Sequence, residues 1–461
     1  MIKHVLLMVM LTIVIVNGWA DGKSISSSSP QESSANPVPI PPGPFDLQTC
    51  FELAVLHSET LGLREEDIRV AQAQYWQAVG TILPKINIIT SQQYQNSQGN
   101  SSTGGGGAIV TDSTGGLNVT GGGTGTSFFQ SRLNVKQPLF SGFREFATSS
   151  AFKADVEARK YNKERSLQLL YLDVSDVFYQ ILMYEGDLKI LAEVQSTLEQ
   201  RIQELDRRVR LGRSRPSELL TAQADLSNTQ VAIEQVRGLL GTSRELMSFL
   251  TAVPSRALKL KDTQSIPSVD ALEAYLTGTG ERPDVLATIA EERAAHKRLS
   301  ATKGERLPTL SLEGNYYLIQ DPSLGRDWNV FLTLDLPLFA GGIIEARIRE
   351  QKALVRASQL NLEQLRRTTD RDIRVAYSNF ITSVAQVIRL HEGQKIAEQN
   401  YQAQNRDYDL GVVSNLDVIF ALRQLSDAKR QLFDAEMETR VNMIRLHIAA
   451  GQAPTKKTAS Q

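Results

Sequence analysis

The pentapeptide Pro-Leu-Phe-Ser-Gly at residues 138–142 returns 199 residues later as Pro-Leu-Phe-Ala-Gly at residues 337–341. The same spacing relates Leu211-Gly212 to Leu410-Gly411. Matches at one constant spacing indicate that a structural unit has been duplicated along the chain. The sequence therefore predicts two tandem copies of one unit.

The first copy carries an insertion rich in glycine. Leu83-Pro84 matches Leu307-Pro308 at the longer spacing of 224, so 25 extra residues lie between the markers of the first copy. A phosphate-binding loop is not predicted, because no Gly-Lys-Ser/Thr follows the glycines. We expect a flexible loop near residues 99–126, whose glycines are Gly104–Gly107, Gly115, Gly116 and Gly121–Gly123.

Each copy is predicted to contain a helix, two strands, a very long helix, a turn and a last helix. No proline occurs from about Phe143 to Leu211, and the second copy repeats this from Gly342 to Leu410. A helix of that length would reach about 100 Å. Apolar residues recur in steps of three and four, which is typical of a seam that packs against other helices: Val174, Val177, Ile181, Tyr184, Leu188, Leu191, Val194, Leu198, Ile202, Leu205 and Val209.

The strands of both copies alternate between apolar and polar residues. This pattern over about ten residues suits a strand with lipid on one side and water on the other. The alternative is a soluble sheet covered by helices. The face opposite the apolar one carries the charged residues Arg132, Lys136, Glu313 and Asp335, which a soluble core would not accept. Four strands cannot close a barrel around a lumen, and an open sheet edge cannot lie in lipid. Several copies of the chain must therefore share one membrane β-barrel.

Composition excludes several classes of function. The 461 residues carry a formal net charge of -1, which disfavours a protein that binds nucleic acid. The five histidines and the single cysteine show no metal-ligand spacing. We therefore expect no metal, no cofactor and no catalytic residues. Cys50 is expected to fill a small apolar site.

The ends of the chain read as export and linker segments. Lys3 and the apolar run 5–16 predict a signal peptide, residues 1–20, cleaved after Ala20. Residues 21–45 form a Ser- and Pro-rich leader, and 453–461 a flexible tail. The first copy is assigned to residues 46–255 and the second to 256–452.

In its two copies and their Leu-Pro, Pro-Leu-Phe-x-Gly and Leu-Gly markers, the chain resembles the TolC-like outer-membrane efflux proteins of Gram-negative bacteria. The resemblance runs from about Asp46 to Gly451. It implies a mainly α-helical homotrimer whose 12-stranded barrel lies in outer-membrane lipid and continues into an α-helical tunnel through the periplasm. It also implies a passive exit duct for an inner-membrane pump of a tripartite efflux or type I secretion system, joined through a periplasmic adaptor.

The resemblance assigns roles to residues around the two Leu-Gly turns. The paired turns would form the periplasmic tips that touch the adaptor, through Leu211, Gly212, Leu410 and Gly411. Asp417 matches an acid of a ring that narrows the entrance, and Tyr408 and Glu218 match a pair that ties neighbouring helices shut. Phe420 stands in place of a second ring acid, and Val413 in place of a bridging arginine.

Purely structural roles also account for the acids at the turns. Ser414 and Asp417 have the spacing of a capping box, and Pro216 suits the first position of a helix with Glu218 two residues later. For the whole chain, the alternative is a secreted periplasmic coiled-coil scaffold whose strands only cap the helices. An enzyme is the least favoured interpretation. The closest combinations of two carboxylates, or of Ser, His and Asp, do not lie together in one local stretch of the sequence.

Overall fold

The computed structural model describes residues 44–96, 110–111, 117–118, 125–262, 270–319 and 327–452. The chain divides into two units, Met1–Gly43 and Pro44–Gln461, and the helices and strands below belong to the second. The predicted signal peptide, nearly all of the predicted leader and the tail lie outside the described residues. Phe45, which we assigned to the leader, is instead buried and pairs with Leu260, because its backbone N–H and C=O bond Lys259 and Lys261.

The predicted order of elements is present twice. The first copy contains α2 (Leu47–His57), α3 (Glu59–Gly80), β1 (Lys85–Asn96), β4 (Gly125–Ser141), α4 (Arg144–Arg210) and α5 (Pro216–Thr251). Two short strands, β2 (Val110–Thr111) and β3 (Leu117–Asn118), pair within the glycine-rich insertion. The second copy contains α6 (Leu272–Leu276), α7 (Pro283–Lys303), β5 (Thr309–Ile319), β6 (Trp328–Asp335), α8 (Ile343–Asp409) and α9 (Asn415–Ala449). Three 3-10 turns lie at Ser255–Ala257, Thr279–Glu281 and Gly304–Arg306.

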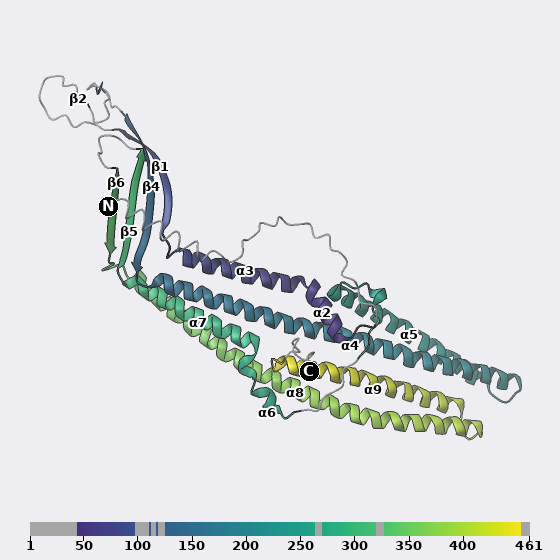
Figure 1. The fold of residues 1–461 in the computed structure, drawn as a ribbon. Coiled ribbons are helices and arrows are strands. Elements are labelled where there is room, and N and C mark those ends of the chain that lie inside the picture. Colours follow the sequence, from purple (N-terminus) through teal and green to yellow (C-terminus); the bar gives the residue numbers. More distant parts are fainter. Residues whose placement is uncertain are drawn as a thin grey trace. The chain divides into compact units, whose positions relative to one another are not determined.

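The two long helices confirm the predicted lengths. Helices α4 and α8 have 67 residues each, or about 100 Å at 1.5 Å per residue. In α4 the predicted seam is buried where it packs between neighbouring helices, at Val174, Ile181, Leu191, Leu198 and Leu205. Helix α4 packs against α3, α5, α7 and α9, while α8 packs against α7 and α9 (Figure 1).

The glycine of the repeated pentapeptide marks the passage from strand to long helix. Gly142 has φ +66° and Gly341 has φ +61°, in the left-handed region that other residues rarely adopt. A Cβ atom on Gly142 would also lie 2.2 Å from the carbonyl oxygen of Gly304. The first glycine is therefore required by its dihedral angle and by close backbone approach.

The four long strands form one antiparallel sheet in the order β1-β4-β5-β6. The register aligns Ser141 with Thr309 and Thr309 with Asp335. The strand ends that connect to helices therefore lie at the same end of the sheet. Among the described residues, strands β1 and β6 each have one neighbour, so both leave a row of backbone groups without a strand partner there.

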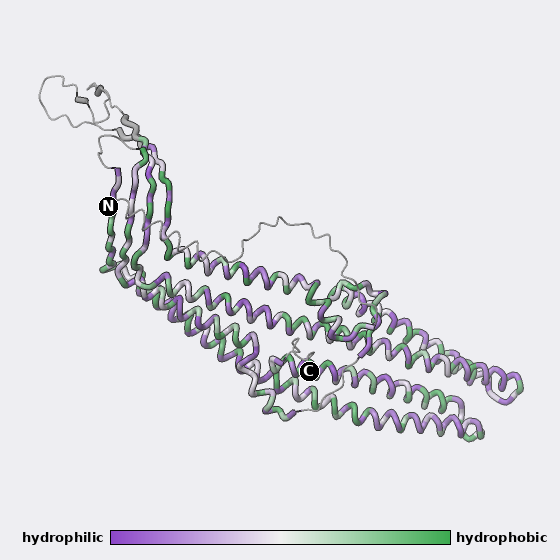
Figure 2. Tube along the Cα trace, viewed as in Figure 1, coloured by the Kyte–Doolittle hydropathy of each residue, from purple (hydrophilic) through white to green (hydrophobic). Residues whose placement is uncertain are grey.

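The sheet has one apolar face, which is exposed. Hydrophobic and hydrophilic residues alternate along the strands (Figure 2). The exposed apolar side chains include Ile86, Ile88, Phe129, Leu312, Tyr316, Leu318, Trp328, Val330, Leu332 and Leu334. No helix covers this face among the described residues, which disfavours the soluble-sheet alternative.

A row of four asparagines crosses the other face. Asn87, Asn134, Asn315 and Asn329 are consecutive partners in the register, one from each strand. Asn134 donates to the side-chain oxygen of Asn315 at 2.8 Å, and Asn315 donates to that of Asn329 at 3.0 Å. Asn329 then donates to the hydroxyl of Tyr317 at 2.9 Å. The face opposite the apolar one is thus polar and internally hydrogen-bonded.

The largest apolar core joins α2 to the middle of α4 and to α5 and α9. It includes Cys50, Val174, Phe178, Met247 and Ile444, all buried. Burial, aided by the nearby charge of Asp46, raises the pKa of the Cys50 thiol to about 12, so the thiolate that would react does not form. Cys50 therefore fills an apolar site. Across the described residues, no helix has the length and apolar character needed to cross a membrane.

Candidate functional site: the paired helix turns

The two Leu-Gly turns end α4 and α8 with the same backbone geometry. Gly212 has φ +69°, and its N–H bonds the carbonyl of Val209 at 2.9 Å while Arg213 bonds that of Arg208 at 2.8 Å. This pair of bonds defines a Schellman motif, which satisfies carbonyls left free at a helix end. Gly411 has φ +75°, and its turn has the same pair of bonds, to Tyr408 at 3.0 Å and from Val412 to Asp407 at 2.9 Å. We call residues 211–215 and 410–414 the tip turns.

The helices that follow the tip turns begin as predicted. Pro216 occupies the first position of α5. Ser414 caps α9, donating to the carboxylate of Asp417 through its backbone N–H at 3.0 Å and its hydroxyl at 2.7 Å. These bonds stabilise the charged form and lower the pKa of Asp417, first through the hydroxyl and then through the backbone. The capping box is confirmed.

Several large apolar side chains around the tip turns are exposed. Leu211 is 63% exposed and Leu410 is 77% exposed. Phe420 is 59% exposed and lies three residues after Asp417, so the two side chains share a face of α9. Val412 and Leu416 are also exposed. Such apolar surface at a helix turn is a candidate contact for other protein chains.

A small apolar core beneath the turns holds the four helix ends together. It contains Leu205 of α4, Ala222 of α5, Tyr408 of α8, and Val418 and Ile419 of α9. Val413 packs against this core as a partly buried side chain. At the position where the resemblance implies a bridging arginine, this chain therefore has an apolar packing residue.

Tyr408 and Glu218 lie near one another without a hydrogen bond. The pKa of Tyr408 is raised, mainly by burial and partly by the charge of Glu218. The carboxylate of Glu218 instead accepts from the hydroxyl of Ser214 at 2.7 Å. In the described part of the chain, the Tyr408 hydroxyl has no hydrogen bond, so the structure shows proximity for this pair and no direct link.

Sequence reasoning missed the two arginines that contact Tyr408. The guanidinium carbons of Arg201 and Arg208 each lie 4.8 Å from the centroid of the Tyr408 ring. Their spacing of seven residues, with Glu204 between them, places all three on one face of a helix. That charged face was visible in the sequence, but its aromatic partner on α8 was not.

Two further polar residues at these helix ends are buried. Asn415 is fully buried, and neither polar atom of its side chain has a hydrogen-bond partner among the described residues. Asp225 of α5 is 4% exposed and forms an ion pair with Arg423 of α9. A buried amide without partners costs about 1–3 kcal/mol, so Asn415 makes this end of the structure less stable.

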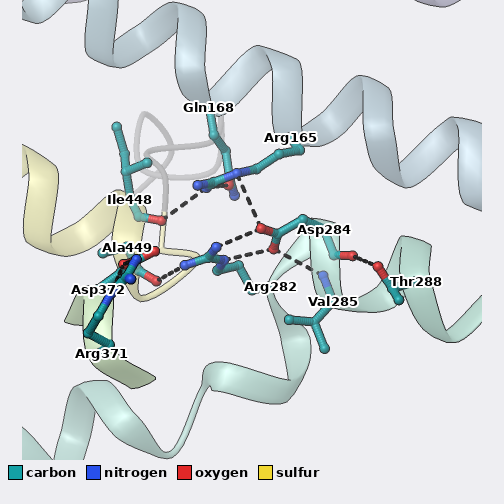
Figure 3. Close-up of polar contacts among 10 residues, drawn as sticks. All are labelled: Arg165, Gln168, Arg282, Asp284, Val285, Thr288, Arg371, Asp372, Ile448 and Ala449. Atoms are coloured by element: carbon teal, nitrogen blue, oxygen red, sulfur yellow. Dashed lines mark hydrogen bonds and ion pairs between the residues drawn. The ribbon is translucent and has the colours of Figure 1, made fainter. Parts of the chain in front are cut away.

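The opposite end of α9 is fixed by a buried polar cluster (Figure 3). Arg282 donates to both carboxylate oxygens of Asp284, at 2.7 and 2.6 Å, and to the carbonyl of Ala449 at 3.2 Å. Arg165 of α4 donates to the carbonyl of Ile448 at 3.3 Å. Two arginines therefore satisfy carbonyls at the end of α9, where the helix dipole also favours positive charge.

The chain matches the family model described as outer membrane efflux protein over residues 52–252 and 279–452. It is 23% identical over 335 residues to outer membrane protein TolC of Vibrio cholerae serotype O1, covering 69% of this chain and 76% of that protein. It is 22% identical over 431 residues to the cation efflux system protein CusC of Escherichia coli K12, covering 88% and 86%.

The fold is also found among solved structures. The crystal structure of the outer membrane protein VceC from Vibrio cholerae superposes with a TM-score of 0.76 at 15% identity, over 88% of this chain and 96% of that chain. At this level of identity the likeness concerns the fold. It confirms the arrangement of long helices and strand pairs predicted from the two copies.

Proposed function

The chain belongs to the outer membrane efflux protein family, and from this premise we propose that it is the passive exit duct through which an inner-membrane pump discharges its substrate. Its location is the outer membrane, with the helices in the periplasm. The duct itself performs no catalysis, as in the channel proteins of this family. Energy for transport comes from the pump.

The exposed apolar face of the four-stranded sheet carries this proposal. In the part of the chain that the structure describes, β1 and β6 each have one edge without a strand partner, and unpaired backbone groups in lipid cost several kcal/mol each. Pairing β1 of one chain with β6 of the next chain leaves no strand edge unpaired when three chains close a 12-stranded barrel. The apolar face then meets lipid, and the face that bears the asparagine row lines the lumen.

The coiled-coil scaffold alternative has less support. A sheet that merely capped a bundle of helices would bury its apolar face against them. Here Ile88, Leu332 and Leu334 are between 64% and 69% exposed. An apolar face of this kind requires a covering, and lipid provides it.

We further propose that the tip turns receive a periplasmic adaptor. The exposed Leu211 and Leu410 occupy equivalent positions in the two copies, directly before Gly212 and Gly411. Three chains would present six such turns in a ring. An adaptor with repeated apolar grooves would therefore meet the same contact at each position.

We also propose that Asp417, with Phe420 on the same helix face, narrows the periplasmic entrance. Three Asp417 side chains around one axis would concentrate negative potential in a narrow pore. Divalent cations should then block current from the periplasmic side. With Phe420 in place of a second acid, the block should be weaker than in a channel with two acidic rings.

Planar-bilayer recordings of the purified protein test both the conduit and the gate. We expect ion-conducting channels that divalent cations block. Asp417→Asn should weaken the block although asparagine can still accept the Ser414 bonds, and Asp417→Ala should weaken it as well. If divalent cations block Asp417→Asn as strongly as the natural protein, Asp417 acts only as a helix cap. If the purified protein forms no channels, the proposed conduit function is wrong.

A further inference from the structure

The side chain of Tyr408 is held by the face of its ring. Both guanidinium carbons that contact it, those of Arg201 and Arg208, lie 4.8 Å from the ring centroid. A guanidinium group within about 6 Å of an aromatic centroid is attracted by the negative ring face. The ring is only 6% exposed, and this attraction strengthens where water is excluded.

The two arginines are themselves fixed in place. Glu204 lies between them; its carboxylate accepts a hydrogen bond from Arg201 at 3.4 Å and forms an ion pair with Arg208 at 2.5 Å. Arg201, whose side chain is 9% exposed, also donates to the side-chain oxygen of Asn405 on α8. Arg208 lies 3.5 Å from the carboxylate of Asp409 on the same helix. Both arginines beside the ring thus have a carboxylate partner of their own.

These contacts connect the end of α4 to the end of α8. Arg201, Glu204 and Arg208 belong to α4, whereas Asn405, Tyr408 and Asp409 belong to α8. Both arginines contact the same ring, so displacement of α8 along or away from α4 would break both contacts together. An arrangement that is lost all at once gives a sharper transition than independent contacts would.

We propose that Arg201, Glu204 and Arg208 form a clamp on the ring of Tyr408, and that this clamp holds the tip ends of α4 and α8 together and keeps the entrance narrow. The second half of this statement rests on the gate proposed above. The arginines are positioning residues, since they act through Tyr408. The hydroxyl of Tyr408 contributes little, and the ring supplies the attachment.

Substitutions at Tyr408 separate the ring from the hydroxyl. Tyr408→Phe keeps the aromatic face and should behave like the natural protein. Tyr408→Leu keeps apolar volume but removes the face, and should release the clamp. Arg201→Gln and Arg208→Gln each remove one cation. Arg210→Gln is the matched control, because Arg210 is 78% exposed and its ion pair within the described residues is with Asp206, on its own helix.

Two measurements on purified trimers report on the clamp and on the gate separately. Hydrogen exchange of residues 201–212 and 401–412 measures whether the helix ends stay together. We expect about fivefold faster exchange for each arginine variant and for Tyr408→Leu, and no change for Tyr408→Phe and Arg210→Gln. Planar-bilayer recordings should show higher conductance in the same three released variants.

The outcomes are distinguishable. Unchanged exchange in Arg201→Gln, Arg208→Gln and Tyr408→Leu would overturn the clamp. If hydrogen exchange in Tyr408→Phe is as fast as in Tyr408→Leu, the hydroxyl of Tyr408 and not its ring holds the helix ends together. Faster exchange in the three released variants with unchanged conductance would leave the clamp as a packing contact and overturn its role in the gate, whereas the gate at Asp417 stands or falls separately with divalent block in Asp417→Asn.

Discussion

Arg282 is the residue of the α9 end cluster whose loss should cost the most stability. Its side chain is 4% exposed and makes three hydrogen bonds, two to Asp284 and one to the carbonyl of Ala449. Arg282→Met keeps most of the apolar stem that packs near Gly451 but removes the charge and all three bonds. Asp284 then retains Arg165 at 3.7 Å and the N–H of Val285 at 3.0 Å.

The size of the effect follows from what is left unpaired. Removing one partner of a buried ion pair typically costs about 3–5 kcal/mol. The remaining contacts of Asp284 compensate in part, so we expect about 3 kcal/mol for Arg282→Met. Burial alone would raise the pKa of Asp284, but the hydrogen bonds and charge of Arg282, with Arg165, lower it below its usual value. The stabilisation is therefore present above the ordinary aspartate pKa and is lost as pH falls through the lowered value.

The assay is denaturant unfolding of the purified protein, followed by circular dichroism, for Arg282→Met, Asp284→Asn and the double variant. We expect a coupling free energy of about 2 kcal/mol between the two sites. Arg371→Met is the control from the same region, since its side chain is 68% exposed and pairs with Asp372. It should cost under about 0.5 kcal/mol. If Arg282→Met lowers the free energy of unfolding by no more than Arg371→Met does, the contacts of Arg282 do not stabilise this end of α9 as proposed.

Two other predictions concern the tip turns and the contact between α4 and α9. A Cβ atom at Gly212 or Gly411 would meet no atom within 4 Å, so Gly212→Val and Gly411→Val should each cost about 1–3 kcal/mol from the strain of the positive φ, and lose export while trimers remain in the membrane. Unchanged export in both glycine variants, with Gly393→Val as the helix control, would contradict adaptor docking. Burial raises the pKa of Asp434 to about 6, with help from Asp187 and against Arg430. The folded state therefore holds a proton that the unfolded state has lost between about pH 4 and 6, so stability falls as pH rises through this range. Asp434→Asn should stabilise by about 1–2 kcal/mol at pH 7.5, after allowance for solvent screening, and by nothing near pH 4, as thermal unfolding at the two pH values would show.

Elements with local signals were predictable from the sequence. The glycines at 212 and 411 have the positive φ that a glycine at the end of a helix favours, and the Ser414–Asp417 cap follows from spacing alone. The two long helices end where the Leu-Gly markers lie, because a left-handed residue satisfies the carbonyls of the last turn.

Pairings between distant segments were not predictable in this way. The asparagine row depends on the register between strands β4 and β5, whose paired residues Asn134 and Asn315 are 181 positions apart. The contact of Arg201 and Arg208 with Tyr408 depends on which helix ends lie within reach of each other's side chains. Phe45 was assigned to the leader because prolines dominate the stretch directly before it, while its burial comes from pairing with Leu260. No local pattern encodes any of these three contacts.

We propose above that three chains close one barrel, because β1 and β6 cannot leave their edges unpaired in lipid. Light scattering of the detergent-solubilised protein, corrected for bound detergent, tests this most directly. We expect a particle of three chains that retains the circular dichroism of strands and helices. A particle of one chain with the same folded signal would contradict it.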